Sequence, residues 1–359
     1  MKRFHFALLA LALLVAQPLV AATYYVGSCH SKAFSTISAA VEAVPAGSTI
    51  EVCPGTYAEQ VVIDKALTVK GISYNNSSQP VIVVPSGGLA TTSSISYGTV
   101  AAQVEVTAGP VNITNITVDG TAASTNCPSV DYIGILYSSG SSGTVNEVET
   151  RNQNCGSVGI GIVAENGAGA TQTVTIQNSN VNTNNYAGIT VESNQIPPSL
   201  TAVIKNNWVT GSSNGIMSSY NPQGSISNNV IEVGLTGVYS GTANVAVSGN
   251  TVAVSGNTVI GGNIGIDITG TAVSITSNRI LNSARAGVYV EVGGITVKNN
   301  TITQVPVGIE FNCITDTNGV TGNTINGATT GIDMVPAGYT GTNKFYNVST
   351  LTTGGCSSE

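Results

Sequence analysis

Acidic and tyrosine side chains recur at one position of a repeated unit in the C-terminal half of this sequence. Each unit contains a glycine followed by Ile or Val, at Gly188, Gly215, Gly237, Gly265, Gly287, Gly308 and Gly331. The residue after this pair is, in order, Thr190, Met217, Tyr239, Asp267, Tyr289, Glu310 and Asp333. Two positions further on, three of the units carry Glu192, Glu291 and Asn312. Because side chains alternate along a strand, these residues are expected to share one outward face.

Three chemistries compete for this face. Stacked strands would place Glu310 about 5 Å from Asp333 and about 10 Å from Asp267, and glycosidases use carboxyl pairs about 5 Å apart when retaining and about 6.5–9.5 Å apart when inverting. Alternatively, Glu310, Asp333 and Asn312 supply oxygen ligands of the kind that Ca²⁺ prefers. The third interpretation is a solvated acidic face that keeps a sparsely charged protein soluble.

The elements that would hold these residues are short strands. Runs such as Val273–Ile275 and Ile295–Val297 alternate apolar and small polar residues, and turn formers bound each run. The unit repeats with a period of about 22 residues, which is typical of a solenoid. We predict an all-β parallel β-helix with three short strands per coil. An Asn-x-(Val/Ile) element in the same units predicts a structural ladder of stacked amides, at Asn207, Asn228, Asn257, Asn278, Asn300 and Asn323.

The N-terminus resembles an export signal. Lys2 and Arg3 precede an apolar run from residue 7 to residue 16, and small residues end the segment at Ala22. We therefore predict a signal peptide over residues 1–22 and a secreted or periplasmic domain over residues 23–359. Residues 23–71 would form the N-terminal cap and first coils, and residues 334–359 the C-terminal cap. The apolar run is shorter than the roughly 20 residues of a membrane span, which favours a removed signal over a membrane anchor. No other segment of the sequence is long and apolar enough to cross a bilayer, so no span is expected after the signal is removed.

The net charge limits the kinds of partner to expect, and the cysteine content bears on the compartment. Without Lys2 and Arg3, the 11 basic residues fall to 9 against 18 acidic ones, a net charge of −9. A nucleic-acid partner is not expected, because no basic patch is present to neutralise phosphates. Six cysteines in an exported chain predict disulfides. Since only neighbouring coils can meet, the expected pairs are Cys29–Cys53, Cys127–Cys155 and Cys313–Cys356.

One helix is expected near the N-terminus, over Phe34–Val44, with Ser35 or Thr36 as its cap and Pro45 after its end. The run from Ser38 to Ile50 and the following Pro54-Gly55-Thr56-Tyr57-Ala58-Glu59 resemble the opening of pectin-lyase-fold proteins, pectinesterases among them. With the later coils, the chain resembles bacterial right-handed parallel β-helix repeat proteins over nearly all of residues 23–359. The resemblance implies a right-handed β-helix whose N-terminal helix covers the core. It does not imply an activity, because this fold hosts lyases, hydrolases, esterases, epimerases and adhesins.

The catalytic segments of these enzymes are missing from the sequence. The Gly-x-Tyr-x-Glu box is present, but the Gln-Asp-Thr, Asp-Phe-Ile-Phe-Gly and Leu-Gly-Arg-Pro-Trp segments of pectinesterases are not, so Glu59 is interpreted as a turn or cap residue. His30 is the only histidine after residue 22, which excludes multi-histidine metal sites. In this fold a lyase base is usually Arg or Lys. Arg285 lies nearest to the acidic column, whereas Arg151 is expected to pair with Asp119.

These observations favour a secreted protein that binds a polysaccharide or cell-surface glycan through its outward sheet face. The expected contacts are Tyr239, Tyr289, Asp267, Glu291, Glu310 and Asn312. No cofactor is expected apart from Ca²⁺ held by Glu310, Asp333 and Asn312. One alternative is a divergent polysaccharide lyase or glycoside hydrolase acting on a pectin-like glycan, with Asp267, Glu310, Asp333 and Arg285 as catalytic candidates. The other is a structural surface protein or adhesin.

Overall fold

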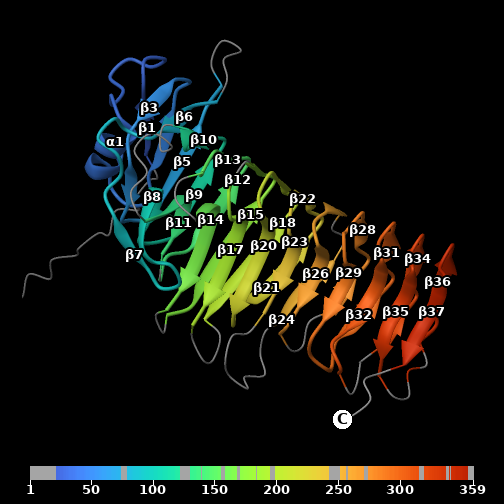
Figure 1. Ribbon diagram of the computed structural model, residues 1–359. Helices are drawn as coiled ribbons and strands as arrows, with labels where there is room; N and C mark the ends of the chain where they lie inside the picture. The colour runs from blue at the N-terminus through green and yellow to red at the C-terminus, as the bar shows by residue number, and fades with distance from the viewer. Residues whose placement is uncertain are drawn as a thin grey trace, which may run out of the picture.

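The computed structural model shows a solenoid of stacked coils (Figure 1). It describes residues 22–73, 79–121, 130–138, 140–154, 158–167, 170–182, 184–194, 199–241, 251–255, 258–270, 274–314, 319–336, 339 and 341–354. Nearly every pair of neighbouring strands is parallel, and each coil contributes one strand to each of three sheets. The chain is therefore a parallel β-helix, as its repeats predict.

Sheet A contains twelve strands, in the order of the stack. They are β1 (Thr23–Val26), β2 (Thr49–Val52), β5 (Leu67–Gly71), β9 (Val111–Thr114), β12 (Gly143–Asn146), β15 (Gln172–Gln177), β18 (Leu200–Lys205), β21 (Gln223–Ser227), β24 (Thr251–Ser255), β27 (Ser274–Thr276), β30 (Thr296–Lys298) and β33 (Gly319–Thr321).

Sheet B also contains twelve strands. They are β3 (Thr56–Ala58), β6 (Val81–Val83), β10 (Thr117–Asp119), β13 (Glu149–Arg151), β16 (Asn180–Asn182), β19 (Trp208–Thr210), β22 (Val230–Val233), β25 (Thr258–Gly261), β28 (Arg279–Leu281), β31 (Thr301–Thr303), β34 (Thr324–Asn326) and β36 (Lys344–Tyr346).

Sheet C contains thirteen strands and faces the viewer in Figure 1. They are β4 (Val61–Ile63), β8 (Gly98–Val106), β11 (Asp131–Tyr137), β14 (Gly159–Asn166), β17 (Ala187–Ser193), β20 (Asn214–Tyr220), β23 (Thr236–Ser240), β26 (Ile264–Ile268), β29 (Ala286–Val290), β32 (Val307–Phe311), β35 (Thr330–Val335) and β37 (Thr350–Gly354), and β7 (Thr92–Ser94) pairs antiparallel with β8 outside the stack.

The core is made of aliphatic side chains stacked from coil to coil. Ile275, Val297 and Val320 occupy one register position of sheet A, and each is at most 1% exposed. The repeated glycine has a steric cause in the same stacking. A Cβ on Gly265 would lie 2.5 Å from the carbonyl oxygen of Gly287 in the next coil. The glycine of each Gly-(Ile/Val) pair thus allows the backbones of neighbouring coils to approach closely, and the Ile or Val that follows it points into the core.

A buried ladder of asparagine side chains joins the coils. One of its members lies one residue after the position that the sequence predicted. Its described members are Asn207, Asn229, Asn278, Asn300, Asn323 and Asn343. Asn229 takes the place that the sequence suggested for Asn228, which instead adopts a left-handed backbone with φ of 56°. The same division holds for Asn206 and Asn207, because asparagine suits both the left-handed turn and the ladder. The expected member Asn257 lies outside the described residues.

In the N-terminal cap, the capping roles predicted for Thr36 and Glu59 are confirmed, and the helix is shorter than predicted. Helix α1 spans Ile37–Ala43, and Thr36 caps it by accepting a hydrogen bond from the Ala39 amide, so the helix begins later than the predicted Phe34. The Glu59 carboxylate accepts hydrogen bonds from the amides of Ile37 and Ser38 at 2.8 Å each. Carboxylates stabilise a helix N-terminus in this way. Glu59 is therefore a cap residue, as its sequence context indicated.

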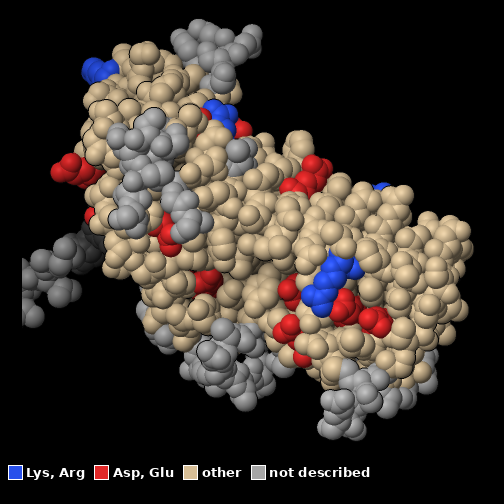
Figure 2. All heavy atoms as spheres, in the orientation of Figure 1, with Lys and Arg blue, Asp and Glu red and all other residues tan. Residues whose placement is uncertain are grey.

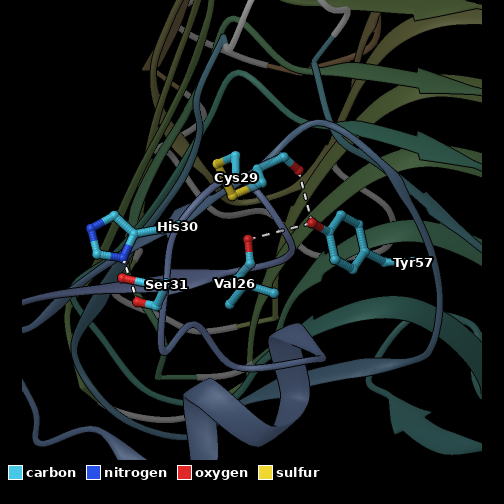
Figure 3. Close-up of a disulfide and its surroundings, with 6 residues drawn as sticks. Val26, Cys29, His30, Ser31 and Tyr57 are labelled. Carbon is cyan, nitrogen blue, oxygen red and sulfur yellow. Dashed lines mark hydrogen bonds between the residues drawn. A yellow bond between two sulfur atoms is a disulfide. The ribbon is translucent and has the colours of Figure 1, made fainter.

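The other members of the Gly-x-Tyr-x-Glu box and its surroundings are also structural (Figure 3). The Cys29–Cys53 disulfide forms as predicted and joins the first turn to the end of β2. The Tyr57 hydroxyl donates to the Cys53 carbonyl oxygen at 2.8 Å. His30 is exposed, and its ring stacks on Tyr25 with the centroids 3.7 Å apart.

The structure tests the two remaining disulfide predictions only in part. Cys313 is disulfide-bonded. Its predicted partner Cys356, together with Cys127 and Cys155, lies outside the described residues. Over the described part of the chain, no helix has the length and apolar character needed to cross a membrane.

Candidate functional site

The outward face of sheet C brings the repeated tyrosine and acidic residues into one column. The strand register pairs Thr190 with Met217, Met217 with Tyr239, and so on to Asp333, one coil at a time. The alignment of the repeats on Gly-(Ile/Val) is thus confirmed. Neighbouring strands of a sheet are about 4.8 Å apart, so Asp267 and Glu310, two coils apart, are separated by about twice that spacing at their backbones.

Arg285 contacts two residues of this column, Glu310 and Tyr289. Its guanidinium donates to both Glu310 carboxylate oxygens, at 2.6 and 3.2 Å, and lies 4.4 Å from the Tyr289 ring centre. Together with Asp267, these residues form what we call the Arg285 cluster. Figure 2 shows basic atoms lying across a group of acidic atoms on this face. Arg285 is therefore held by Glu310, and one face of Tyr289 is covered by the guanidinium.

Asp267 is the unusual member of the Arg285 cluster. Burial raises the pKa of its carboxyl from 3.8 to about 6, and the charge of Glu291 adds to the rise while Arg285 opposes it. Its Oδ1 atom is buried and accepts no hydrogen bond from any described residue. A carboxyl with a pKa near 6 is able to exchange a proton near neutral pH, which is the property of a general acid or base.

The residues beyond Glu310 do not converge on it. The Asp333 carboxylate accepts hydrogen bonds from the Thr353 hydroxyl and from the amide of Met334. Glu291 and Asn312 are exposed. Among the residues that the structure describes, no three His, Cys, Asp or Glu side chains are close enough together to hold a metal ion. Ca²⁺ binding by Glu310, Asp333 and Asn312 stays a prediction.

A strap that the sequence did not reveal covers the N-terminal half of the same face. It runs from β7 to Tyr97, and its hydroxyl groups donate to three carboxylates of sheet C. Thr92 donates to Glu105 at 2.8 Å, Ser94 to Glu165 at 2.6 Å and Tyr97 to Glu192 at 2.8 Å. An outer apolar cluster that includes Val100, Ile133, Leu136, Ile160 and Val163 lies on this half of the sheet. Such long-range contacts leave no periodic signal in the sequence.

A pocket of about 190 Å³ lies where the strap ends. Six of the residues that line it are Tyr97, Tyr186, Tyr220, Tyr239, Met217 and Glu192. We call it the tyrosine pocket. Tyr239 belongs to both the tyrosine pocket and the column, directly beside Asp267. The two features therefore form one continuous surface.

Arg151 lies on another face and has a structural role. Its Nε donates to Asp119 at 2.8 Å and its Nη1 to Glu149 at 3.1 Å, within the register of β10 and β13. The ion pair expected between Arg151 and Asp119 is confirmed.

Replacing Arg285 with alanine is expected to change both stability and titration. Glu310 is 9% exposed and would keep an unpaired charge, so we expect a loss of about 1 kcal/mol, at the upper end of the range of exposed pairs. The pKa of Asp267 is expected to rise further, because Arg285 lowers it. Melting curves and carboxyl NMR titration measure the two effects. Arg279→Ala, at an exposed site on sheet B, is the control, and an unchanged Asp267 titration in the Arg285 variant would contradict the assignment.

Comparison with known proteins identifies one matching family model. It is described as periplasmic copper-binding protein (NosD) and matches residues 203–349, less than half of the chain. The periplasmic description and the Cys29–Cys53 disulfide both fit an exported protein. Copper prefers imidazole and sulfur ligands, yet the matched residues contain no histidine, and their one cysteine, Cys313, is disulfide-bonded. Their two methionines, Met217 and Met334, lie on β20 and β35, five coils apart. These residues do not fit a copper site. Curated protein sequences give no match.

Solved structures resemble the chain in fold. A lacto-N-biosidase from Eubacterium ramulus matches with a TM-score of 0.66 at 10% identity, over 92% of this chain and 68% of its own. PfbA, a surface adhesin of Streptococcus pneumoniae, matches with 0.51 at 16% identity, over 88% of both chains. The Dettilon tailspike protein matches with 0.54 at 16% identity over 84% of this chain, which spans only 62% of the tailspike. The chain is a right-handed parallel β-helix protein of the pectin-lyase-like fold.

Proposed function

We propose that this protein is exported by its N-terminal signal and binds a glycan on the outward face of sheet C. The observation that carries the proposal is the continuity of the tyrosine pocket with the Arg285 cluster through Tyr239. Tyrosine rings offer an apolar face and a polar edge, which suit a sugar ring and its hydroxyl groups.

The polar groups on this surface have the chemistry that a glycan requires. Glu291 and Asn312 are exposed, and the Arg285 side chain is 44% exposed although it is paired with Glu310. Carboxylates accept hydrogen bonds from sugar hydroxyls, and a guanidinium and an amide donate them. Carbohydrate-active enzymes and an adhesin share the fold, which supports this use of the face.

The test is affinity electrophoresis of the protein without its signal in gels that contain neutral, amino or acidic polysaccharides. At least one glycan is expected to retard the wild type. Tyr239→Ala is expected to weaken that retention about tenfold, because a contact worth about 1.4 kcal/mol is lost. Tyr346→Ala, at a tyrosine that is 53% exposed on sheet B, controls for a general surface effect. If no glycan retards the wild type, the proposal fails and a structural surface protein becomes the better interpretation.

A second candidate function, cleavage of the bound glycan, is favoured by Asp267. Its pKa of about 6 and its place beside Arg285 suit a general acid. Wild-type protein would then release reducing ends from a hydrolysed polysaccharide, or unsaturated products from a lyase reaction, and Asp267→Asn would abolish the release. Retention of a glycan with neither product would instead assign the face to binding alone.

A further inference from the structure

The tyrosine pocket is lined by a buried carboxylate, and glycan binding alone does not explain why it is there. Glu192 lines it and is 4% exposed, and Glu165, its register neighbour in the preceding coil, is 1% exposed. Strand spacing puts the two backbones about 4.8 Å apart. Burial raises the pKa of both carboxyls, and the charge of Glu192 raises that of Glu165 further.

No cation within the described residues compensates these two carboxylates. The ion pairs found there join Arg151 to Asp119 and Glu149, and Arg285 to Glu310. Glu165 is instead stabilised by Ser94 and by the amide of Ile95. Glu192 accepts the Tyr97 hydroxyl on Oε1, and the neighbouring Ser96 hydroxyl also lowers its pKa. Within the described residues, no hydrogen bond of ordinary geometry reaches its buried Oε2. The pocket thus contains a buried carboxylate oxygen with capacity to spare.

We propose that the tyrosine pocket binds the ammonium group of a glycan built from amino sugars whose nitrogen is not acetylated. This inference rests on the proposed function and names the class of glycan. A carboxylate and several aromatic rings around one small cavity are the groups that recognise an alkylammonium ion, through a charge-assisted hydrogen bond and cation–π contacts. An ammonium ion bound against the Glu192 carboxylate supplies the charge that the pocket lacks.

The same electrostatics work against acidic sugars. A uronate carboxylate in this pocket would face Glu192, with Glu165 in the preceding coil behind it, without a compensating cation. Arg285, the basic residue of the Arg285 cluster, already donates to both oxygens of Glu310. The pocket therefore selects amino sugars over the pectin-like glycans suggested by the resemblance to pectin-lyase-fold enzymes.

The experiment compares oligosaccharides of glucosamine with oligosaccharides of N-acetylglucosamine of the same length by isothermal titration calorimetry. Wild-type protein is expected to bind the amino form at least tenfold more tightly. Glu192→Gln, which keeps the acceptor for Tyr97 but removes the charge, is expected to abolish that preference. Glu232→Gln, at an exposed carboxylate on sheet B, is expected to retain it.

Each outcome separates this inference from the function on which it rests. Equal binding of the two oligosaccharides by the wild type overturns the amino-sugar inference and leaves glycan binding standing. Persistence of the preference in a folded Glu192→Gln protein overturns the role of Glu192. Absence of binding to either oligosaccharide, combined with retention of a neutral polysaccharide in the gel, also overturns the inference, whereas failure of the whole polysaccharide panel overturns the proposed function itself. If Glu192→Gln does not fold, the wild-type preference alone decides.

Discussion

Asn300→Ala is expected to lower the free energy of unfolding by about 3–5 kcal/mol. Asn300 is 1% exposed, and its side chain joins three coils. Its Oδ1 accepts from the backbone amide and side chain of Asn278, and its Nδ2 donates to the Ile275 carbonyl and to Asn323 Oδ1, all at 2.9 Å. Alanine leaves a buried amide and a buried carbonyl without these partners, at about 1–3 kcal/mol each, and adds a cavity.

Thermal or denaturant unfolding followed by circular dichroism measures this loss. Asn299→Gly is the matched control, because Asn299 is exposed, has a φ of 58° and precedes the ladder residue. Gly322 occupies the equivalent place before Asn323 with a φ of 70°. Glycine adopts this conformation without strain, so the control is expected to stay within about 0.5 kcal/mol of the wild type. If both variants unfold like the wild type, the ladder does not stabilise the stack as argued.

The one-residue error in the ladder shows how far a repeat pattern can predict structure. The period of the glycines predicted which strands are neighbours, and it aligned Tyr289, Glu310 and Asp333 correctly. This is possible because each coil must stack its apolar side chains on the next. Asn228 and Asn229 are neighbours in the sequence. Because asparagine suits both the left-handed turn and the ladder, the repeat pattern does not show which of the two residues joins the ladder.

The candidate site was only partly predictable, for a different physical reason. Arg285 was expected near the acidic column. Its ion pair with Glu310 rather than with Asp267 was not predictable, because it depends on how far a long side chain reaches. The contact between Tyr97 and Glu192 joins residues 95 positions apart. It belongs to a strap that occurs once, so no repeat indicates it. The strap covers Glu165 and Glu192 on sheet C and supplies Tyr97 to the tyrosine pocket, so the repeat pattern indicates neither the buried carboxylates nor the pocket.

Asp267→Asn is expected to stabilise the protein at neutral pH and to have little effect in acid. The folded protein raises the pKa of Asp267 from 3.8 to about 6. The charged form is therefore penalised in the folded state. This penalty is absent below pH 3.8, grows as pH rises through the interval, and is complete above about pH 6. At about 1.4 kcal/mol per pKa unit, it amounts to about 3 kcal/mol. Asparagine has nearly the shape of the neutral carboxyl and does not titrate.

The measurement is the difference in unfolding free energy between Asp267→Asn and the wild type at pH 3.5 and at pH 7.5, with Asp64→Asn, at an exposed aspartate, as the control. Glu291→Gln supplies a second check, because removing its charge is expected to lower the pKa of Asp267 and shrink the difference. A difference of equal size at both pH values would show that Asp267 is not perturbed. A difference that appears only at neutral pH would mean that the fold tolerates a destabilising carboxylate on the face proposed to bind a glycan, as expected of a residue kept for binding or catalysis rather than for stability.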